Sequence, residues 1–311
     1  MALPNPSADV LTPGSVQDKR GARRPRRWSL NSAAPYLLLA PSLLFLAVFF
    51  AWPMVQALIL SVQTPEGEFT TQYLQRMVSD VNFSDAIRNT LLLIITVIPI
   101  QFVLAVIMGL ALQAKPKSAS FFLYLWTIPL GVSDLAAGIV WLAIFGDRGF
   151  LNSVLTGLGL MNTPFAWLSY EHPLSLLAAV VIAEVWRATS IVMVIVVAGL
   201  QLIPPDYTEA AEVFGATTWQ RLWHVTLPML RPSLQVALIL RTILAFQVFA
   251  VVVALAGTRM PVLASEAYNW YGGNHNPNVA AAYALLILIF SLVTTGLYLR
   301  ALRTRDEELG Q

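Results

Sequence analysis

The sequence contains no cysteine and only three histidines, and each scarcity removes a class of function. Without cysteine there is no disulfide framework, no thiolate nucleophile and no cysteine-bound metal. The histidines, His172, His224 and His275, lie far apart in the chain, so one subunit is not expected to assemble a metal cluster or a histidine-based triad from them. The sequence therefore gives no indication of catalysis.

A nucleotide-binding P-loop is also missing. Such a loop needs glycine-rich backbone followed by Lys and then Ser or Thr. The one lysine followed by such a residue is Lys117, before Ser118, and Pro116 rather than glycine precedes it. If the chain takes part in a process driven by ATP, the ATPase must lie on another chain.

Charge is scarce as well, whereas long apolar runs are abundant. Charged residues make up 12% of the 311 residues and hydrophobic residues 57%, against roughly 25% charged residues in soluble domains. Six segments reach the length of about 20 residues that crosses a bilayer as a helix. We therefore predict an all-α integral membrane protein with six transmembrane helices, at residues 33–62, 86–113, 121–145, 174–203, 229–255 and 279–302.

Basic residues are distributed unevenly around these spans. Residues 1–30 are rich in Arg, Pro and Ser, which predicts a disordered basic tail before a membrane domain at 31–311. The first apolar run is longer than the core of a signal peptide, so we expect it to be retained. With six spans, most Lys and Arg residues fall on the side of the two termini, which the positive-inside rule places in the cytoplasm.

One polar stretch, residues 204–228, interrupts the apolar pattern between the fourth and fifth spans. We call it the central loop. Pro204 and Pro205 end the fourth span, and Asp206 with Glu209 predicts an N-cap and a capping box. Gly215 is placed to end this short helix in a left-handed conformation. Thr217 with Gln220 predicts a second capping box, and Pro228 is predicted to end the second helix.

The central loop resembles the EAA loop of permease subunits in ABC importers. That motif reads EAA, three residues, G, nine residues, I-x-L-P. Here Glu209, Ala210 and Ala211 precede Gly215, and Val225 replaces isoleucine before Thr226, Leu227 and Pro228. Further stretches, such as VWRATSIVMVIVVAGLQLIPPDYTEAA, are similar to the carbohydrate-uptake branch of these permeases.

This resemblance implies a type I ABC importer permease fold and a set of partners. They are a second homologous permease, two ATPase subunits, which would bind ATP and Mg, an extracytoplasmic solute-binding protein, the lipid membrane and a sugar, with no nucleic acid and no cofactor on this chain. The resemblance also implies that Glu209, Ala210, Ala211, Gly215, Leu227 and Pro228 couple this chain to the ATPase. It points to a disaccharide such as trehalose as the solute, with maltose and glycerol phosphate as alternatives.

Four charged residues fall within the predicted spans, namely Asp134, Glu184, Arg187 and Arg241. Intramembrane charges cost about 2.5–3.5 kcal/mol each at a helix centre, so they are candidates for function. Glu184 and Arg187 share a helix face, and with Asp134 they are predicted to form an intramembrane ion pair. That pair either fixes the packing of two spans or holds Arg187 on a polar path.

The resemblance adds candidates for the solute path, because sugar permeases of this type bind solute with the fourth and fifth spans. It points to Arg187, Ala188 and Ile191 in the fourth span and to Arg241, Ala245 and Val248 in the fifth. Gln247 lies beside them. Two other classes remain open: a membrane-embedded enzyme, which would need catalytic groups clustered at one depth, and a secondary transporter built from internal repeats.

Overall fold

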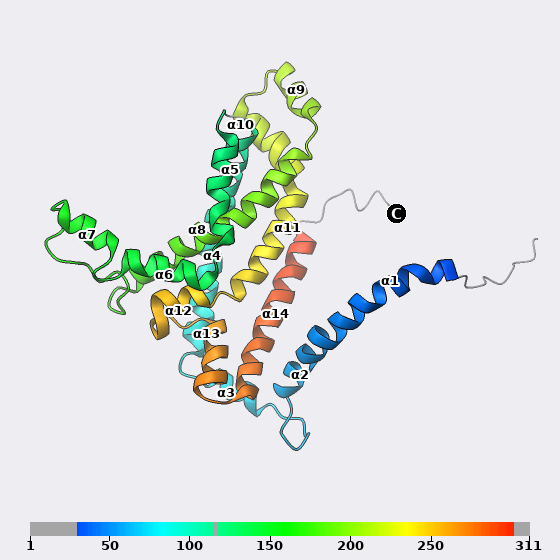
Figure 1. Ribbon diagram of the computed structural model, residues 1–311, viewed down its shortest axis with the longest axis vertical. Coiled ribbons are helices and arrows are strands. Elements are labelled where there is room, and N and C mark those ends of the chain that lie inside the picture. Colours follow the sequence, from blue (N-terminus) through cyan, green and yellow to red (C-terminus); the bar gives the residue numbers. More distant parts are fainter. Residues whose placement is uncertain (1–29, 115–116, 302–311) are drawn as a thin grey trace, which may run out of the picture. The chain divides into compact units, whose positions relative to one another are not determined.

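The computed structural model describes residues 30–114 and 117–301 (Figure 1). The predicted basic tail therefore lies almost wholly outside the described residues. The chain divides into two units, residues 1–53 and 54–311. The first unit contains α1 (Leu30–Leu46) and the π-helical turn η1 (Ala47–Ala51), and α2 (Trp52–Leu60) continues from it.

The second unit is helical apart from one isolated antiparallel bridge between Gln63 and Phe69. Its elements follow in chain order: α3 (Gln72–Val78), α4 (Phe83–Gln113), α5 (Ala119–Thr127), η2 (Ile128–Gly131), α6 (Asp134–Phe145), α7 (Phe150–Gly157), α8 (Pro173–Gln201), α9 (Pro205–Val213), α10 (Thr218–Arg221), η3 (Leu222–Thr226), α11 (Leu227–Phe246), α12 (Ala250–Ala256), η4 (Gly257–Arg259), α13 (Leu263–Tyr268), η5 (Asn269–Gly273) and α14 (Pro277–Ala301).

Five helices are long and apolar enough to cross a membrane, at Leu37–Leu60, Phe83–Gln113, Pro173–Gln201, Thr218–Phe246 and Pro277–Ala301. These overlap five of the six predicted spans. Two further helix pairs bring the number to as many as seven, so the predicted six lies within the range that the structure allows. The all-helical membrane fold is thus confirmed.

The third predicted span differs from expectation because it is not straight. Ala119–Gly131 and Asp134–Gly157 meet at an angle of 103°. Pro129 and Gly131 lie in the 3-10 turn η2, and the Ser133 hydroxyl then caps α6 by accepting from the Ala136 N–H at 3.2 Å. Proline, glycine and a new N-cap in succession explain the break.

The fifth predicted span ends earlier than expected. Helix α11 ends at Phe246 rather than near residue 255, and α12 packs back against α6. Gly138 allows this close approach, because a Cβ placed on it would lie 2.5 Å from the Ala254 Cβ. The second bent pair, Ala250–Arg259 with Leu263–Gly273, makes an angle of 82°.

The core of the second unit follows the long helices. Helix α8 packs along α4 and also contacts α11, while α14 packs against α11 and α13. Val192, Met193 and Val196 on α8 are fully buried against α4 and α11. Figure 1 shows α9 and α10 at one end of this unit and α3 and α13 at the opposite end.

Candidate functional site

The first helix of the central loop begins two residues earlier than the capping pattern predicts. Pro205 is the first residue of α9, Pro204 occupies the N-cap position, and no side chain caps this end. The prediction of Asp206 as N-cap is therefore wrong. Proline at the first helical position has the right backbone angle and no N–H to satisfy, so Asp206 moves into the first turn, where its charge suits the helix dipole.

Gly215 ends α9 in the left-handed conformation that the sequence predicts, with φ of +77°. The Gly215 N–H donates to the Glu212 carbonyl and the Ala216 N–H to the Ala211 carbonyl, both at 2.9 Å. This pair of bonds is a Schellman motif, which satisfies the last carbonyls of the helix. A residue with a Cβ is strained at such a φ, so Gly215 determines the direction of the chain after α9.

The second predicted capping box is present. The Thr217 hydroxyl accepts from the Gln220 N–H at 3.3 Å, and the Gln220 side chain accepts from the Thr217 N–H at 2.8 Å. Across the turn, the Arg221 guanidinium forms an ion pair with Glu212 on α9. The two short helices are thereby fixed relative to each other.

Pro228 does not end the second helix, so that prediction is also wrong. Thr218–Phe246 is one continuous helix, and the π-helical turn η3 lies just before the proline. The Leu227 N–H donates to the Leu222 carbonyl, five residues back. Proline lacks the N–H and crowds the carbonyl four residues before it; the wider turn relieves this conflict at His224. Another π turn, η1, stands in the same place before Pro53.

The central loop exposes large apolar side chains that no part of the described chain covers. Val213 is 85% exposed, Phe214 89%, Trp219 66% and Trp223 53%. The two tryptophans contact each other edge to face at 5.7 Å. Large exposed apolar patches indicate an interaction surface.

The predicted coupling residues lie on or beside this surface. Glu209 and Ala210 are exposed, and Ala211, Leu227 and Pro228 are half-buried. Among the described residues, no side chain hydrogen bonds to Glu209. Its carboxylate is therefore available to a partner, whereas Glu212 is already paired with Arg221.

A second group, which we call the charge cluster, consists of Asp134, Glu184, Arg187 and Arg241. Glu184 lies at its centre and is only 1% exposed. Its Oε2 accepts from Arg241 Nη2 at 2.9 Å and from Arg187 Nη2 at 3.2 Å. One buried carboxylate thus pairs with two arginines, as buried charge requires.

The part of the charge cluster formed by Arg187 and Asp134 is partly exposed at the surface of the chain. Arg187 Nη1 lies 2.7 Å from Asp134 Oδ1, and the two side chains are 18% and 51% exposed. Asp134 is the first residue of α6, directly after the 103° break, so the pair joins this break to α8. The structure therefore brings together the three residues predicted to form the intramembrane ion pair.

Sequence reasoning missed the fifth member of this network, Gln101 in α4. Its Oε1 accepts from Arg241 Nε at 2.7 Å, and its Nε2 donates to the Glu184 main-chain carbonyl at 2.9 Å. Gln101 is fully buried. An amide inside an otherwise apolar span was the available signal, because it must find partners there. Through these bonds the network joins α4, α8 and α11.

The residues suggested for a solute path are only partly accessible in this conformation. Ala188, Arg241, Ala245 and Val248 are buried within the chain. Arg187 and Ile191 are half-buried, and Gln247, at the end of α11, is exposed. Arg241 faces Glu184 and Gln101 rather than open space. Arg187, Ile191 and Gln247 are therefore the members of the set that reach the surface of this chain.

A comparison with known families finds a match over most of the chain. The profile of the family described as binding-protein-dependent transport system inner membrane component matches residues 101–303. This range contains the whole central loop and the whole charge cluster.

Individual relatives cover almost the entire chain. The trehalose/maltose transport system permease protein MalF of Thermococcus litoralis is 31% identical over 287 residues, which is 88% of this chain and 94% of that protein. The trehalose transport system permease protein SugA of Mycobacterium tuberculosis is 28% identical over 300 residues, or 92% of each chain. The sulfoquinovosyl glycerol transport system permease protein SmoG of Agrobacterium fabrum is 31% identical over 288 residues, covering 87% of this chain and 90% of its own.

A solved structure shares the fold. A chain of a bacterial alginate ABC transporter, in complex with an alginate pentasaccharide-bound periplasmic protein, superimposes with a TM-score of 0.74 at 20% identity. The match covers 88% of this chain and 95% of that one. At this identity the likeness establishes the arrangement of helices.

Proposed function

We infer that this chain, which belongs to the family of binding-protein-dependent transport system inner membrane components, is the permease subunit of an ATP-driven importer for sugars. The observation that carries the proposal is the central loop: an EAA motif on two rigidly joined helices whose apolar surface no part of the described chain covers. The chain is a non-catalytic membrane component, and ATP with Mg would bind to a separate ATPase.

The partners follow from this role. We propose a second permease of similar fold, two ATPase subunits and an outer solute-binding protein. The exposed Val213 and Phe214 would enter a groove on the ATPase, with Glu209 making polar contacts at its edge. The Schellman motif and the Arg221–Glu212 ion pair would let the two helices move as one body.

Movement of the central loop would reach the spans through one helix. Thr218–Phe246 runs without a break from the capping box at Thr217 to Arg241 and beyond. Arg241 is bonded to Glu184 on α8 and to Gln101 on α4. A displacement of the central loop would therefore shift three spans together, which is what alternating access between the two sides of a membrane needs.

The basic residues support a cytoplasmic central loop. Lys117 in the turn before α5, Arg221 in α10 and Arg231 in α11 lie at the end of the second unit that carries the central loop. Arg76 in α3 and Arg88 near the start of α4 lie at the other end, and the topology predicted from the sequence assigns Arg148 and Arg259 to the same side. By the positive-inside rule, we propose that the first end and both chain termini are cytoplasmic.

For the solute, we propose a disaccharide such as trehalose. The relatives SugA and MalF are named for trehalose and for trehalose and maltose, which supports a disaccharide over a smaller polyol. Arg187, Ile191 and Gln247 are the residues of this chain that we expect to face it. Uptake of labelled trehalose, maltose and glycerol phosphate by a strain that lacks the chain, with and without a plasmid-borne copy, identifies the solute.

The coupling role is tested with Gly215→Val, which forces a Cβ into a left-handed conformation. We expect normal membrane insertion and a copurified ATPase, but uptake reduced by at least about tenfold, since loss of about 1.4 kcal/mol in coupling corresponds to that factor. Gly159→Val is the matched control, because Gly159 also has a positive φ, of +71°, and open space around it.

A second variant tests Glu209 directly. Glu209→Lys should lower uptake while ATP hydrolysis by the complex no longer responds to sugar and solute-binding protein. Glu66→Lys, a charge reversal in the loop before α3, is the control for the change in charge. Unchanged uptake in both Gly215→Val and Glu209→Lys would contradict the docking role of the central loop, and absence of any copurifying ATPase would contradict the importer itself.

A further inference from the structure

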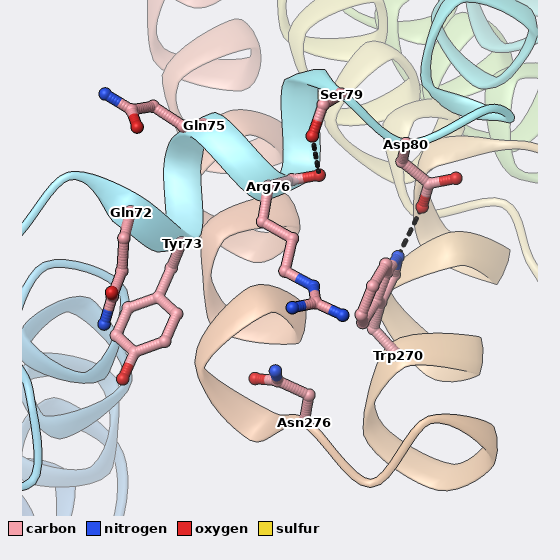
Figure 2. A pocket seen from close by; sticks show the side chains of 8 residues that line it. All are labelled: Gln72, Tyr73, Gln75, Arg76, Ser79, Asp80, Trp270 and Asn276. Atoms are coloured by element: carbon pink, nitrogen blue, oxygen red, sulfur yellow. Dashed lines mark hydrogen bonds between the residues drawn. The ribbon is translucent and has the colours of Figure 1, made fainter.

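A polar pocket of about 820 Å³ lies at the opposite end of the second unit from the central loop (Figure 2). Helix α3 forms one wall, and η5 with the residues before α14 forms the other. Its volume lies within the range of about 300–1,000 Å³ that is usual for small-molecule sites. None of the residues predicted for coupling or for the solute path lines it.

One wall of the pocket is a tryptophan whose orientation is fixed. The Trp270 Nε1–H donates to Asp80 Oδ2, which also accepts from the Tyr283 hydroxyl at 3.1 Å. Asp80 Oδ1 accepts from the Asn82 N–H at 3.0 Å. The Asp80 carboxylate is thus occupied by three donors, and it acts as a positioning residue for the indole ring.

The other groups of the pocket offer hydrogen bonds to a ligand. The Arg76 guanidinium lies over the Trp270 ring, 5.5 Å from its centroid, and no acceptor among the described residues bonds to its side chain. The Asn276 Oδ1 accepts from the Val279 N–H at 3.2 Å, which leaves its amide nitrogen as a donor. Figure 2 shows Tyr73 and Trp270 on opposite sides of the space into which Arg76 reaches.

This combination matches the chemistry of a neutral sugar. Arg76 and Asp80 carry opposite charges, so the wall has no net charge that would select an ion. Amide and guanidinium donors suit hydroxyl oxygens, the Gln72 amide adds an acceptor, and aromatic rings pack against the apolar faces of a pyranose. The alternative occupant is a side chain from a partner protein. One side chain would fill only a small part of the 820 Å³ pocket, whereas a sugar would fill more of it.

We propose that this pocket is a low-affinity binding site for a neutral sugar, separate from the path through the spans. Under the topology proposed above, the pocket lies on the extracytoplasmic side of the membrane, where sugar arrives. The inference rests on the proposed function for this location and for the presence of sugar. Sugar hydroxyls would accept from Arg76 and Asn276, and the ring would lie between Tyr73 and the Arg76 guanidinium that Trp270 supports. The site would hold sugar close to the permease before or after its transfer.

The test uses the complete transporter, with both permeases and the ATPase subunits, in lipid nanodiscs without the solute-binding protein. Binding of labelled trehalose and maltose is measured at equilibrium. We expect Arg76→Met and Trp270→Ala each to weaken binding by about tenfold or more, the effect of losing one hydrogen bond to a charged group or one ring contact. Trp270→Phe should restore most of the affinity, because it keeps an aromatic face.

Controls assign the binding to this pocket. Tyr271→Ala changes an exposed aromatic residue next to Trp270, and Arg88→Met changes an exposed arginine near the start of α4. Neither residue lines the pocket, so neither change should affect this binding. Binding that disappears in Arg187→Met but persists in Arg76→Met and Trp270→Ala would overturn the inference. So would variants of the pocket that bind sugar normally but lose affinity for the solute-binding protein, since the pocket would then be a protein contact.

Uptake by the wild-type transporter separates the two proposals. If a sugar is taken up and no binding depends on Arg76 or Trp270, the pocket inference alone fails. If no sugar is taken up, the proposed function fails, and binding that depends on the pocket would still support the site. If the wild-type transporter binds neither sugar up to the highest concentration measured, the pocket inference is overturned.

Discussion

The central loop and the charge cluster each place side chains where their polarity is unfavourable, but in opposite ways: the loop exposes apolar side chains and the cluster buries charged ones. The central loop lies outside the spans yet exposes Val213 and Phe214 almost fully. The charge cluster lies among the spans yet buries Glu184 and Arg241 almost fully. The loop leaves apolar side chains without a partner among residues 30–114 and 117–301, whereas the cluster provides nearly every one of its charges with a partner. The first arrangement is typical of an interaction surface, and the second is typical of a contact between helices of one chain.

The largest effect should come from Glu184→Gln, because that change leaves two arginines without their shared carboxylate. Removing one partner from a buried charge network destabilises a protein by about 3–5 kcal/mol. We expect much lower yield and a lower melting temperature of the purified permease pair. Asp134→Asn is the control, since its half-exposed pair with Arg187 should contribute at most about 1 kcal/mol. Equal losses in the two variants would mean that the cluster is not centred on Glu184.

The next largest effect should appear only in the assembled complex. Phe214→Ser removes the most exposed aromatic ring of the central loop, so the stability of this chain should change by no more than about 0.5 kcal/mol. Affinity for the ATPase should fall by about 2 kcal/mol or more, the usual loss at a central interface residue. Titration of the ATPase onto the permease pair measures this. Phe69→Ser, at an exposed ring in the loop before α3, should leave the affinity unchanged.

The smallest predicted effect concerns the internal rigidity of the central loop. Thr217→Ala removes the hydroxyl that accepts from the Gln220 N–H, which should destabilise this turn by about 1 kcal/mol. Hydrogen exchange of the Gln220 and Arg221 amides should become faster. The neighbouring Thr218→Ala serves as the control. Equal exchange rates in the two variants would show that the capping box does not hold the start of the helix.

Much of the fold could be predicted from the sequence because a few simple constraints determine where a chain crosses a membrane. Length and hydropathy were enough to place five of the long helices, since a lipid environment permits little else. The conformation of Gly215 and the capping box at Thr217 followed from local backbone chemistry. Both depend on residues within one or two turns of each other.

The wrong predictions have a common cause. A straight helix and a bent or broken one can have the same pattern of apolar residues along the sequence. The break after Gly131 and the π turn before Pro228 depend on how a proline is accommodated, and hydropathy does not report that. Gln101 was missed for a related reason. Its two partners, Glu184 and Arg241, lie 83 and 140 residues away, so only the packing of three helices brings them together.

The π turn at Leu222–Thr226 also determines how the side chains before it are rotated about the helix axis relative to those after it. It accommodates one residue more than a regular helical turn, and each residue of an α-helix rotates its side chain by about 100° about the axis. The side chain of Trp219 therefore points to a different side of the helix, relative to Arg241, than it would in a regular α-helix with the same number of residues. Insertion of one residue into the regular helix between Pro228 and Arg241 would rotate the central loop by about that angle while leaving every motif in it intact. The EAA sequence thus specifies what the ATPase would bind, and the extra residue specifies the direction from which it would be bound.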